Sequence, residues 1–246
     1  MKVTVLKSGS KGNSTLIETD NLNILIDAGI TLKELTNYKD DIKIDVVFIT
    51  HAHSDHTSGL KRIYNKFSPI IYTRNEDVLK NTDYESVYLE KDITLENLNI
   101  ISFNLSHDSD CIGFLIKDLN TDNELVYITD TGYINKKILD IIHNKNTYII
   151  ESNHDTEMLR KGPYPFYLKQ RILSDTGHLS NKDCCKYLKD LVGKDTKNIV
   201  LAHISENNNT KEIVLDEINN MVNDNGFNYV NIYVAEQKHN LDLIEV

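Results

Sequence analysis

The sequence has few of the residues that mark secreted, membrane-spanning or multidomain proteins. It contains only 3 cysteines and 3 prolines among 246 residues. No apolar run approaches the length that a bilayer span requires, and the polar Met1–Lys7 segment predicts a first strand rather than a signal peptide. No linker or internal repeat divides the chain. We therefore expect one domain over residues 1–246, in a reducing, cytoplasmic compartment and without membrane contact.

The positions of the cysteines also argue against a disulfide framework and against a zinc-finger site. Cys184 and Cys185 are adjacent and Cys111 is distant, so there is neither a disulfide framework nor zinc-finger spacing. Positive charge is scarce as well: 37 acidic residues against 27 Lys and Arg give a formal net charge of −10. This balance argues against indiscriminate nucleic-acid binding, although it allows a local basic patch. Nothing in the sequence specifies an oligomeric state.

Apolar segments with strand and helix spacing predict an α/β fold. Helical spacing predicts helices from Leu60 to Phe67, over Ile134–Ile142, Asn181–Leu191 and Glu212–Val222, with Ile134, Ile138 and Ile141 on the buried face of the second. Because the strands fall into two groups with helices outside them, we expect a layered arrangement with two central sheets. The strands are expected at Val3–Leu6, Thr15–Glu18, Asn23–Ile26, Val46–Thr50, Ile70–Thr73, Ser86–Tyr88, Leu98–Phe103, Ile112–Ile116, Leu125–Thr129, Tyr148–Glu151, Ile199–Ala202 and Tyr229–Val234.

The segment His51-Ala52-His53-Ser54-Asp55-His56 directly follows one of these apolar strands. Four groups that bind metals within six residues serve no purpose in packing. Neutral imidazole and carboxylate are ligands that suit zinc, iron and manganese. The segment therefore predicts a metal site at a strand end, and a metallohydrolase.

Three more potential ligands follow predicted strands in the same way. His107 comes after the strand that ends near Leu105, Asp130 directly after Thr129, and His203 directly after Ala202. For Asp130 alone, a turn before Gly132 is the alternative. Seven ligands are too many for one zinc ion and suit two bridged divalent ions. A water between two such ions loses a proton near neutral pH, so we expect a metal-bridging hydroxide as the nucleophile.

This pattern resembles the metallo-β-lactamase superfamily along essentially the whole chain, and Asp27 matches an early Asp of that superfamily. The resemblance implies the αββα four-layer sandwich of the metallo-β-lactamase type. It implies that one ion is held by His51, His53 and His107 and the second by Asp55, His56 and His203, with Asp130 as the bridge. Zn, Mn and Fe all remain open as the metal.

Four further segments are similar to the YycJ (WalJ) branch of the superfamily: Ser8–Ser14, Glu151–Asp155, Arg171–Ser180 and Leu201–Ser205. Members of that branch are regarded as DNA exonucleases that work from the 5′ end, so the resemblance implies DNA rather than RNA as the substrate. Gly177–Ser180 is also similar to a segment of the tRNA 3′-processing endonucleases, in which a Glu–His pair assists proton transfer. The chain lacks their long inserted arm.

Two histidines outside the ligand set are candidate functional residues. We expect catalysis to depend on Asp55 and Asp130, which hold the ions, and on His178, which would contact the scissile phosphate or protonate the leaving oxygen. The alternative for His178 is a structural residue at a helix start. His154 is a candidate substrate contact, with an ordinary loop histidine as the alternative.

The segment from Met158 to Arg171 carries positive charge and no acidic residue. Tyr164, Phe166 and Tyr167 are interleaved with its basic residues. We interpret it as a loop that tracks a phosphate backbone while its aromatic rings stack on bases; the alternative is a solvated loop whose rings pack into the core. The candidate substrate contacts in this segment are Arg160, Lys161, Lys169 and Arg171.

The leading hypothesis is a dinuclear metal-dependent phosphodiesterase, a DNA exonuclease acting from the 5′ end. A tRNA-processing type of endonuclease is one alternative. Another is a hydrolase of a small acyl substrate, such as a thioesterase, lactonase or β-lactamase, which needs a small apolar pocket. A degenerate domain that only binds metal or a signalling partner is a third class.

Overall fold

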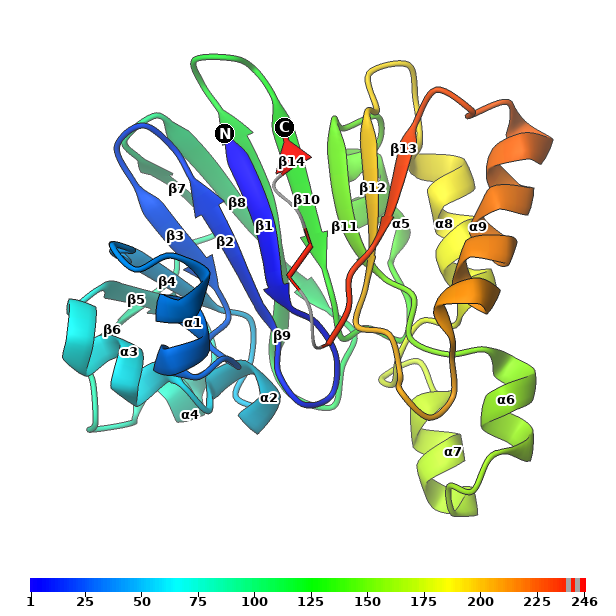
Figure 1. Ribbon diagram of the computed structural model, residues 1–246, viewed down its shortest axis with the longest axis horizontal. Helices are drawn as coiled ribbons and strands as arrows, with labels where there is room; N and C mark the ends of the chain where they lie inside the picture. Colours follow the sequence, from blue (N-terminus) through cyan, green and yellow to red (C-terminus); the bar gives the residue numbers. More distant parts are fainter. Residues whose placement is uncertain (238–239, 242–243) are drawn as a thin grey trace.

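The computed structural model describes residues 1–237, 240–241 and 244–246, and two seven-stranded sheets face each other at its centre (Figure 1). The first sheet has the order β14 (Ile244–Glu245), β1 (Lys2–Lys7), β2 (Ser14–Glu18), β3 (Asn23–Ile26), β4 (Val46–Ile49), β5 (Ile70–Thr73) and β6 (Ser86–Tyr88). The second has the order β13 (Asn231–Val234), β12 (Asn198–Ala202), β11 (Thr147–Glu151), β10 (Glu124–Ile128), β9 (Cys111–Asp118), β8 (Leu98–Leu105) and β7 (Asp92–Leu95).

Helices cover the outer face of each sheet, which makes four layers. Figure 1 shows one group beside the first sheet and a second group beside the other sheet. The first group is α1 (Leu32–Tyr38), α2 (Ser54–Thr57), α3 (Leu60–Phe67) and α4 (Glu76–Leu79). The second is α5 (Lys136–Ile142), α8 (Asn181–Leu191) and α9 (Lys211–Asn225), with α6 (Thr156–Lys161) and α7 (Phe166–Ile172) beyond the sheet's lower edge.

Three apolar clusters hold these layers together. The central cluster lies between the two sheets and includes Phe48 and Phe114, whose ring centroids are 5.4 Å apart. A second cluster joins the first sheet to its helices through residues such as Leu35 and Ile63. The third joins the other sheet to α5, α8 and α9. The αββα sandwich expected from the sequence is therefore the observed fold.

Several details differ from the expectations. Ile134 and Ile138 are buried as predicted, but Ile141 is 42% exposed and helix α5 buries Ile142 instead, so the prediction was wrong at Ile141. The segment from Met158 to Arg171 is mostly helical rather than a loop, because α6 and α7 occupy most of it. No helix in the described part of the chain is long and apolar enough to cross a membrane.

Candidate active site

The seven predicted ligands converge at one end of the sandwich. His51, His53 and His107 offer ligand atoms within 4.8 Å of one another. Asp55, His56 and His203 form a second group with the same spacing. Asp130 groups with His51 and His56, and its Oδ2 lies 3.2 Å from His56 Nε2 while its Oδ1 lies 3.4 Å from His203 Nε2. Asp130 thus lies where the two groups meet.

Strand ends deliver most of these side chains. β4 is followed by His51, and the short helix α2 carries Asp55 and His56. β10 and β12 are followed by Asp130 and His203, which have left-handed backbone angles with φ of 58° and 54°. Asp and His tolerate this conformation better than most residues, and such angles concentrate at functional sites. The turns aim both side chains across the end of the sandwich.

Neighbouring side chains orient three of the histidine rings through their Nδ1 atoms. His56 Nδ1 lies 2.8 Å from Asp27 Oδ2, His203 Nδ1 lies 2.9 Å from Glu151 Oε1, and His51 Nδ1 lies 3.0 Å from Thr50 Oγ1. A partner on Nδ1 fixes the ring and leaves Nε2 for a metal. Among the described residues, four buried ligand atoms make no hydrogen bond: Nε2 of His51, His107 and His203, and Oδ2 of Asp130. A donor set of imidazole and carboxylate with these atoms free fits divalent metal ions.

The charge states of Asp130 and His51 suit metal binding. Burial by itself would raise the pKa of the Asp130 carboxyl group, but His203 and His56 hold it well below its usual value. Burial, reinforced by His56, lowers the pKa of His51 to about 2. Near neutral pH these two ligands are therefore an ionised carboxylate and a neutral imidazole, the forms that bind metals. Burial by itself would lower the pKa of His203, but the carboxylates of Asp130, Asp55 and Glu151 outweigh it and raise that pKa to about 10, so a metal would displace a proton from that ring.

Glu151 is a candidate functional residue that the sequence did not single out. Its buried carboxylate lies 2.7 Å from His178 Nδ1 and 2.9 Å from His203 Nδ1, and it also accepts the backbone N–H of Thr131 at 3.0 Å. Burial opposes ionisation, but His178 and His203 lower the pKa of Glu151 to about 2. Glu151 ends β11, so the rule that found the metal ligands, a polar residue at a strand end, also applies to it.

The segment Ser8–Ser14 contributes to the same end of the molecule. It is the turn between antiparallel β1 and β2, as expected. It also enters the site, because Asn13 Nδ2 lies 2.9 Å from His56 Nε2 and 3.2 Å from Asp55 Oδ2. Ser8 Oγ accepts the backbone N–H of His203 at 2.7 Å. The turn therefore helps to hold ligands from both sheets.

A cavity of about 350 Å³ opens over the ligands, and His178 and Arg171 line it with them. Gly177 allows the chain to pass tightly over the end of α7, because a side chain there would meet Ile172 O at 2.2 Å. His178 consequently faces the ligands, with its Nδ1 3.8 Å from Asp130 Oδ1. Arg171 donates to Asp108 Oδ2 at 2.6 Å. Asp108 Oδ1 in turn lies 3.2 Å from His107 Nε2.

Comparison with known proteins agrees with this geometry. A family profile described as "Beta-lactamase superfamily domain" matches residues 22–204. The chain belongs to the β-lactamase superfamily. It is 37% identical over 228 residues, 86% of this chain and 84% of the relative, to a protein named exodeoxyribonuclease WalJ from Streptococcus pneumoniae. It is 34% identical over 238 residues, 91% of this chain and 90% of the relative, to one named exodeoxyribonuclease YycJ from Bacillus anthracis.

Structural similarity extends over the same length. The metallo-β-lactamase fold protein YhfI from Bacillus subtilis matches with a TM-score of 0.75 at 17% identity, over 98% of this chain and 99% of that one. Both the fold and the family expected from the sequence are confirmed. Membership of the β-lactamase superfamily, together with the His and Asp ligand groups, makes the protein a metal-dependent hydrolase.

Not all predicted substrate contacts reach the pocket of this superfamily member. His154 is only 1% exposed and does not line the cavity. Lys169 Nζ donates to the carbonyl oxygens of Arg160 and Gly162 at 2.8 and 2.7 Å, so it joins α7 to the end of α6. Arg160 and Lys161 are exposed and pair with Glu157 on the surface of α6. Of the five predicted substrate contacts, Arg171 alone lines the cavity over the candidate metal ligands, which is called the metal pocket below.

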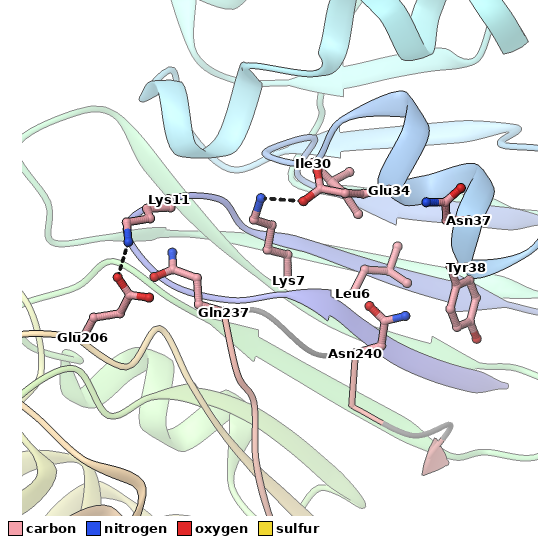
Figure 2. Close-up of a pocket in the computed structure, with 10 residues that line it drawn as sticks. All are labelled: Leu6, Lys7, Lys11, Ile30, Glu34, Asn37, Tyr38, Glu206, Gln237 and Asn240. Carbon is pink, nitrogen blue, oxygen red and sulfur yellow. Dashed lines mark hydrogen bonds and ion pairs between the residues drawn. The ribbon is translucent and has the colours of Figure 1, made fainter.

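A second cavity, of about 400 Å³, lies between the β1–β2 turn, α1 and Gln237 (Figure 2). Its two cations are already neutralised: Lys7 Nζ donates to Glu34 Oε1 at 3.0 Å, and Lys11 pairs with Glu206. It shares no lining residue with the metal pocket. This cavity therefore lies apart from the His and Asp cluster of this β-lactamase superfamily protein.

Proposed function

We propose that this protein is a dinuclear metal-dependent DNA exonuclease that degrades a strand from its 5′ end. The observation that carries the proposal is one pocket that combines two ligand groups, the shared Asp130, the Glu151–His178 pair and the guanidinium of Arg171. The relatives that are 34–37% identical bear the name exodeoxyribonuclease, which supports DNA as the substrate. The length shared with them, and the single fold, support one functional domain over residues 1–246.

His51, His53 and His107 would hold one ion, Asp55, His56 and His203 the other, and Asp130 would bridge them. When bound, the two ions would supply an activated water and neutralise charge on the phosphate. Arg171 would bind a phosphate oxygen next to the scissile bond. Asp108 contacts Nε and one terminal nitrogen of Arg171, which leaves the other terminal nitrogen for the phosphate. Helices α6 and α7 form a helical hairpin. Arg160 and Lys161 lie on its first helix and would contact the DNA strand beyond the scissile phosphate.

His178 would serve the leaving oxygen. Its Nδ1 lies 2.7 Å from Glu151 Oε1, which would orient the ring with Nε2 toward the cavity. A protonated imidazole next to the departing alkoxide donates its proton as the P–O bond breaks. Glu151 would be the positioning residue of this pair and would orient His203 at the same time.

The decisive experiment combines metal analysis of the purified protein with hydrolysis assays. The substrates are 5′- and 3′-labelled oligonucleotides, single-stranded and duplex, in DNA and in RNA form. The proposal expects about two divalent ions per chain and stepwise removal of nucleotides from the 5′ end of DNA. It also expects loss of activity with chelator and recovery with Zn, Mn or Fe. Cleavage of RNA at an internal position would instead support the tRNA-processing alternative.

Charge reversal tests the substrate separately. Arg160→Glu combined with Arg171→Glu should weaken DNA binding and flatten its dependence on salt, because each lost phosphate contact reduces the salt slope by about one. Binding that is unchanged at low and moderate salt would remove these residues from the interface. Arg62→Glu combined with Lys66→Glu on α3, on the other helical layer, provides the control with the same change in net charge.

Acyl hydrolysis is the weaker candidate for the same centre. A small acyl substrate requires a largely apolar pocket, whereas this cavity is lined by His, Asp, Ser and Arg side chains. Hydrolysis of bis-p-nitrophenyl phosphate without hydrolysis of a thioester would exclude it. The opposite result would exclude the nuclease.

A further inference from the structure

Two aromatic rings stand free on the hairpin that borders the metal pocket. Phe166 is 77% exposed and Tyr167 is 75% exposed, more than any other large apolar side chain among the described residues. They are consecutive residues at the start of α7, and the helix ends at Arg171 and Ile172 beside the candidate metal ligands. The alternative that these two rings pack into the core is therefore wrong.

The hairpin that presents the rings is held firmly. Leu159 of α6 and Ile172 of α7 are buried and anchor its inner side. Lys169 joins the two helices through the carbonyl oxygens of Arg160 and Gly162, and Tyr164 Oη accepts a hydrogen bond from Asn207 Nδ2 at 2.9 Å. Phe166 and Tyr167 are thus exposed on an ordered helix, whose backbone is already in place before anything binds.

The position of the rings relative to the pocket suggests their ligand. At a helix rise of about 1.5 Å per residue, Tyr167 and Arg171 are separated by roughly 6 Å along α7. That is close to the length of two stacked nucleotides, at about 3.4 Å each. A strand whose phosphate contacts Arg171 would bring the bases one or two nucleotides away next to the rings. Figure 1 shows α6 and α7 extending beyond the sheet edge at the same end as α2 and the β1–β2 turn.

The positive charge near the rings also favours a nucleic-acid strand as the ligand. The exposed cations Arg160 and Lys161 end α6 on the same hairpin, in a chain whose formal net charge is −10. Aromatic rings beside cations match single-stranded nucleic acid, in which the phosphates meet the cations and each base has a face to stack. Bases inside an intact duplex have no free face to offer.

We propose that Phe166 and Tyr167 form a stacking platform for unpaired bases of the DNA strand whose phosphodiester lies in the metal pocket. This rests on the proposed nuclease function and adds the preferred form of its substrate: a strand end that is single-stranded or frayed over its first nucleotides. The platform holds that end open while Arg171 and the metal ligands hold the phosphate.

The test uses the full chain with both residues replaced, Phe166→Ala and Tyr167→Ala together. Because stacking on one ring is worth about a tenfold or larger factor in affinity per base, KM for a single-stranded oligonucleotide should rise about ten- to a hundredfold, with little change in kcat. An oligonucleotide with abasic sites at its first nucleotides should show little difference between the variant and the wild type. The wild type should favour a duplex with an unpaired 5′ end over a blunt duplex, and the variant should lose that preference.

Tyr229→Ala is the matched control, because Tyr229 is 53% exposed and precedes β13 at the opposite end of the sheet from His203. It should leave KM for every substrate unchanged. Phe166→Tyr with Tyr167→Phe should restore wild-type behaviour, since both rings are kept. Thermal melting of the double alanine variant should match the wild type, because the lost surface was already exposed.

The outcomes separate the two proposals. If the wild type cuts DNA and the double alanine variant keeps the wild-type KM, the platform is refuted while the nuclease stands. If the variant loses as much activity on abasic DNA or on bis-p-nitrophenyl phosphate as on normal DNA, the rings support the pocket rather than bases, and the platform is again refuted. If the wild type neither binds nor cuts DNA, the nuclease function itself fails.

Discussion

At the scale of single residues, Asp130 is the position at which the two candidate ligand groups meet. It links the two ligand groups and has a left-handed φ of 58°. Asn tolerates that conformation and has nearly the same shape, so Asp130→Asn should fold. The amide lacks the charge that would bridge the two proposed cations, so hydrolysis should fall at least a hundredfold and metal content should fall toward one ion or none. Circular dichroism, metal analysis and bis-p-nitrophenyl phosphate turnover check this; a folded variant with full activity would defeat the bridging role.

Glu151 should affect metal binding without being a ligand, because it orients His203 through Nδ1 and His178 through the same oxygen. Glu151→Gln keeps the side chain's shape but removes the charge that supports both rings. Loss of such an orienting carboxylate typically costs ten- to a hundredfold in metal affinity or activity. Metal titration measures the affinity. A variant that loses turnover at saturating metal as well would place Glu151 in proton transfer through His178, whereas unchanged affinity and turnover would contradict both roles.

For His154 we predict an effect on the pH dependence of stability rather than on catalysis. Burial lowers the pKa of His154 to about 4, and neither ring nitrogen has a hydrogen-bond partner among the described residues. An unfolded histidine titrates near 6.5, so between about pH 6.5 and 4 the unfolded chain binds a proton that the folded chain does not. Because of His154, the free energy of unfolding should therefore fall as the pH is lowered through that window, by at most about 3 kcal/mol.

His154→Leu should remove this contribution, and it costs no hydrogen bond. Urea unfolding of chelator-treated protein from pH 7 to 4 would show it as a smaller acid-side loss in the variant than in the wild type. His143→Leu is the control, since His143 is exposed. Parallel pH curves for wild type and His154→Leu would contradict the assignment.

At the scale of helices and strands, the strong signals in the sequence were apolar runs and their polar ends. Runs such as Val46–Ile49 are buried at every position, so their strands and the ligands after them could be predicted. Helices α6 and α7 bury only Leu159 and Ile172. With one buried position each, they have no apolar periodicity to detect. Glu151 was missed for another reason: the role of a carboxylate that orients other side chains depends on contacts that only the fold creates.

Lys169 tests whether the α6–α7 hairpin is held as one element. The sequence suggested a phosphate contact, whereas its ammonium group donates to two carbonyl oxygens at the end of α6. Lys169→Met keeps the aliphatic stem and removes both bonds, so amide hydrogens over residues 156–172 should exchange faster while those of β10 and β11 stay protected. Hydrogen exchange with mass spectrometry measures this.

Lys161→Met is the control, because Lys161 is exposed and pairs with Glu157 on the surface. It should leave exchange in the hairpin unchanged while still removing one positive charge. If Lys169→Met also left exchange unchanged but weakened DNA binding, Lys169 would be a phosphate contact after all.

At the scale of the whole molecule, the two sheets share a single central core, which argues for one folding unit. Phe114 of β9 is fully buried and packs against Phe48 of the opposite sheet. Phe114→Ala should lower the free energy of unfolding by about 3–5 kcal/mol, the usual cost of a large cavity in a core. Because the missing ring faces both sheets, both should lose stability together.

Calorimetry and hydrogen exchange measure that coupling. One cooperative transition with equal calorimetric and van't Hoff enthalpies is expected for wild type and Phe114→Ala, with exchange accelerated on β4 as well as on β10. Leu119→Ala is the control, since Leu119 is 49% exposed in the turn after β9 and should shift the transition little. Two transitions, of which the substitution moves only one, would show that the halves fold separately. The metal site would then be assembled between two independent units, since its ligands come from both sheets.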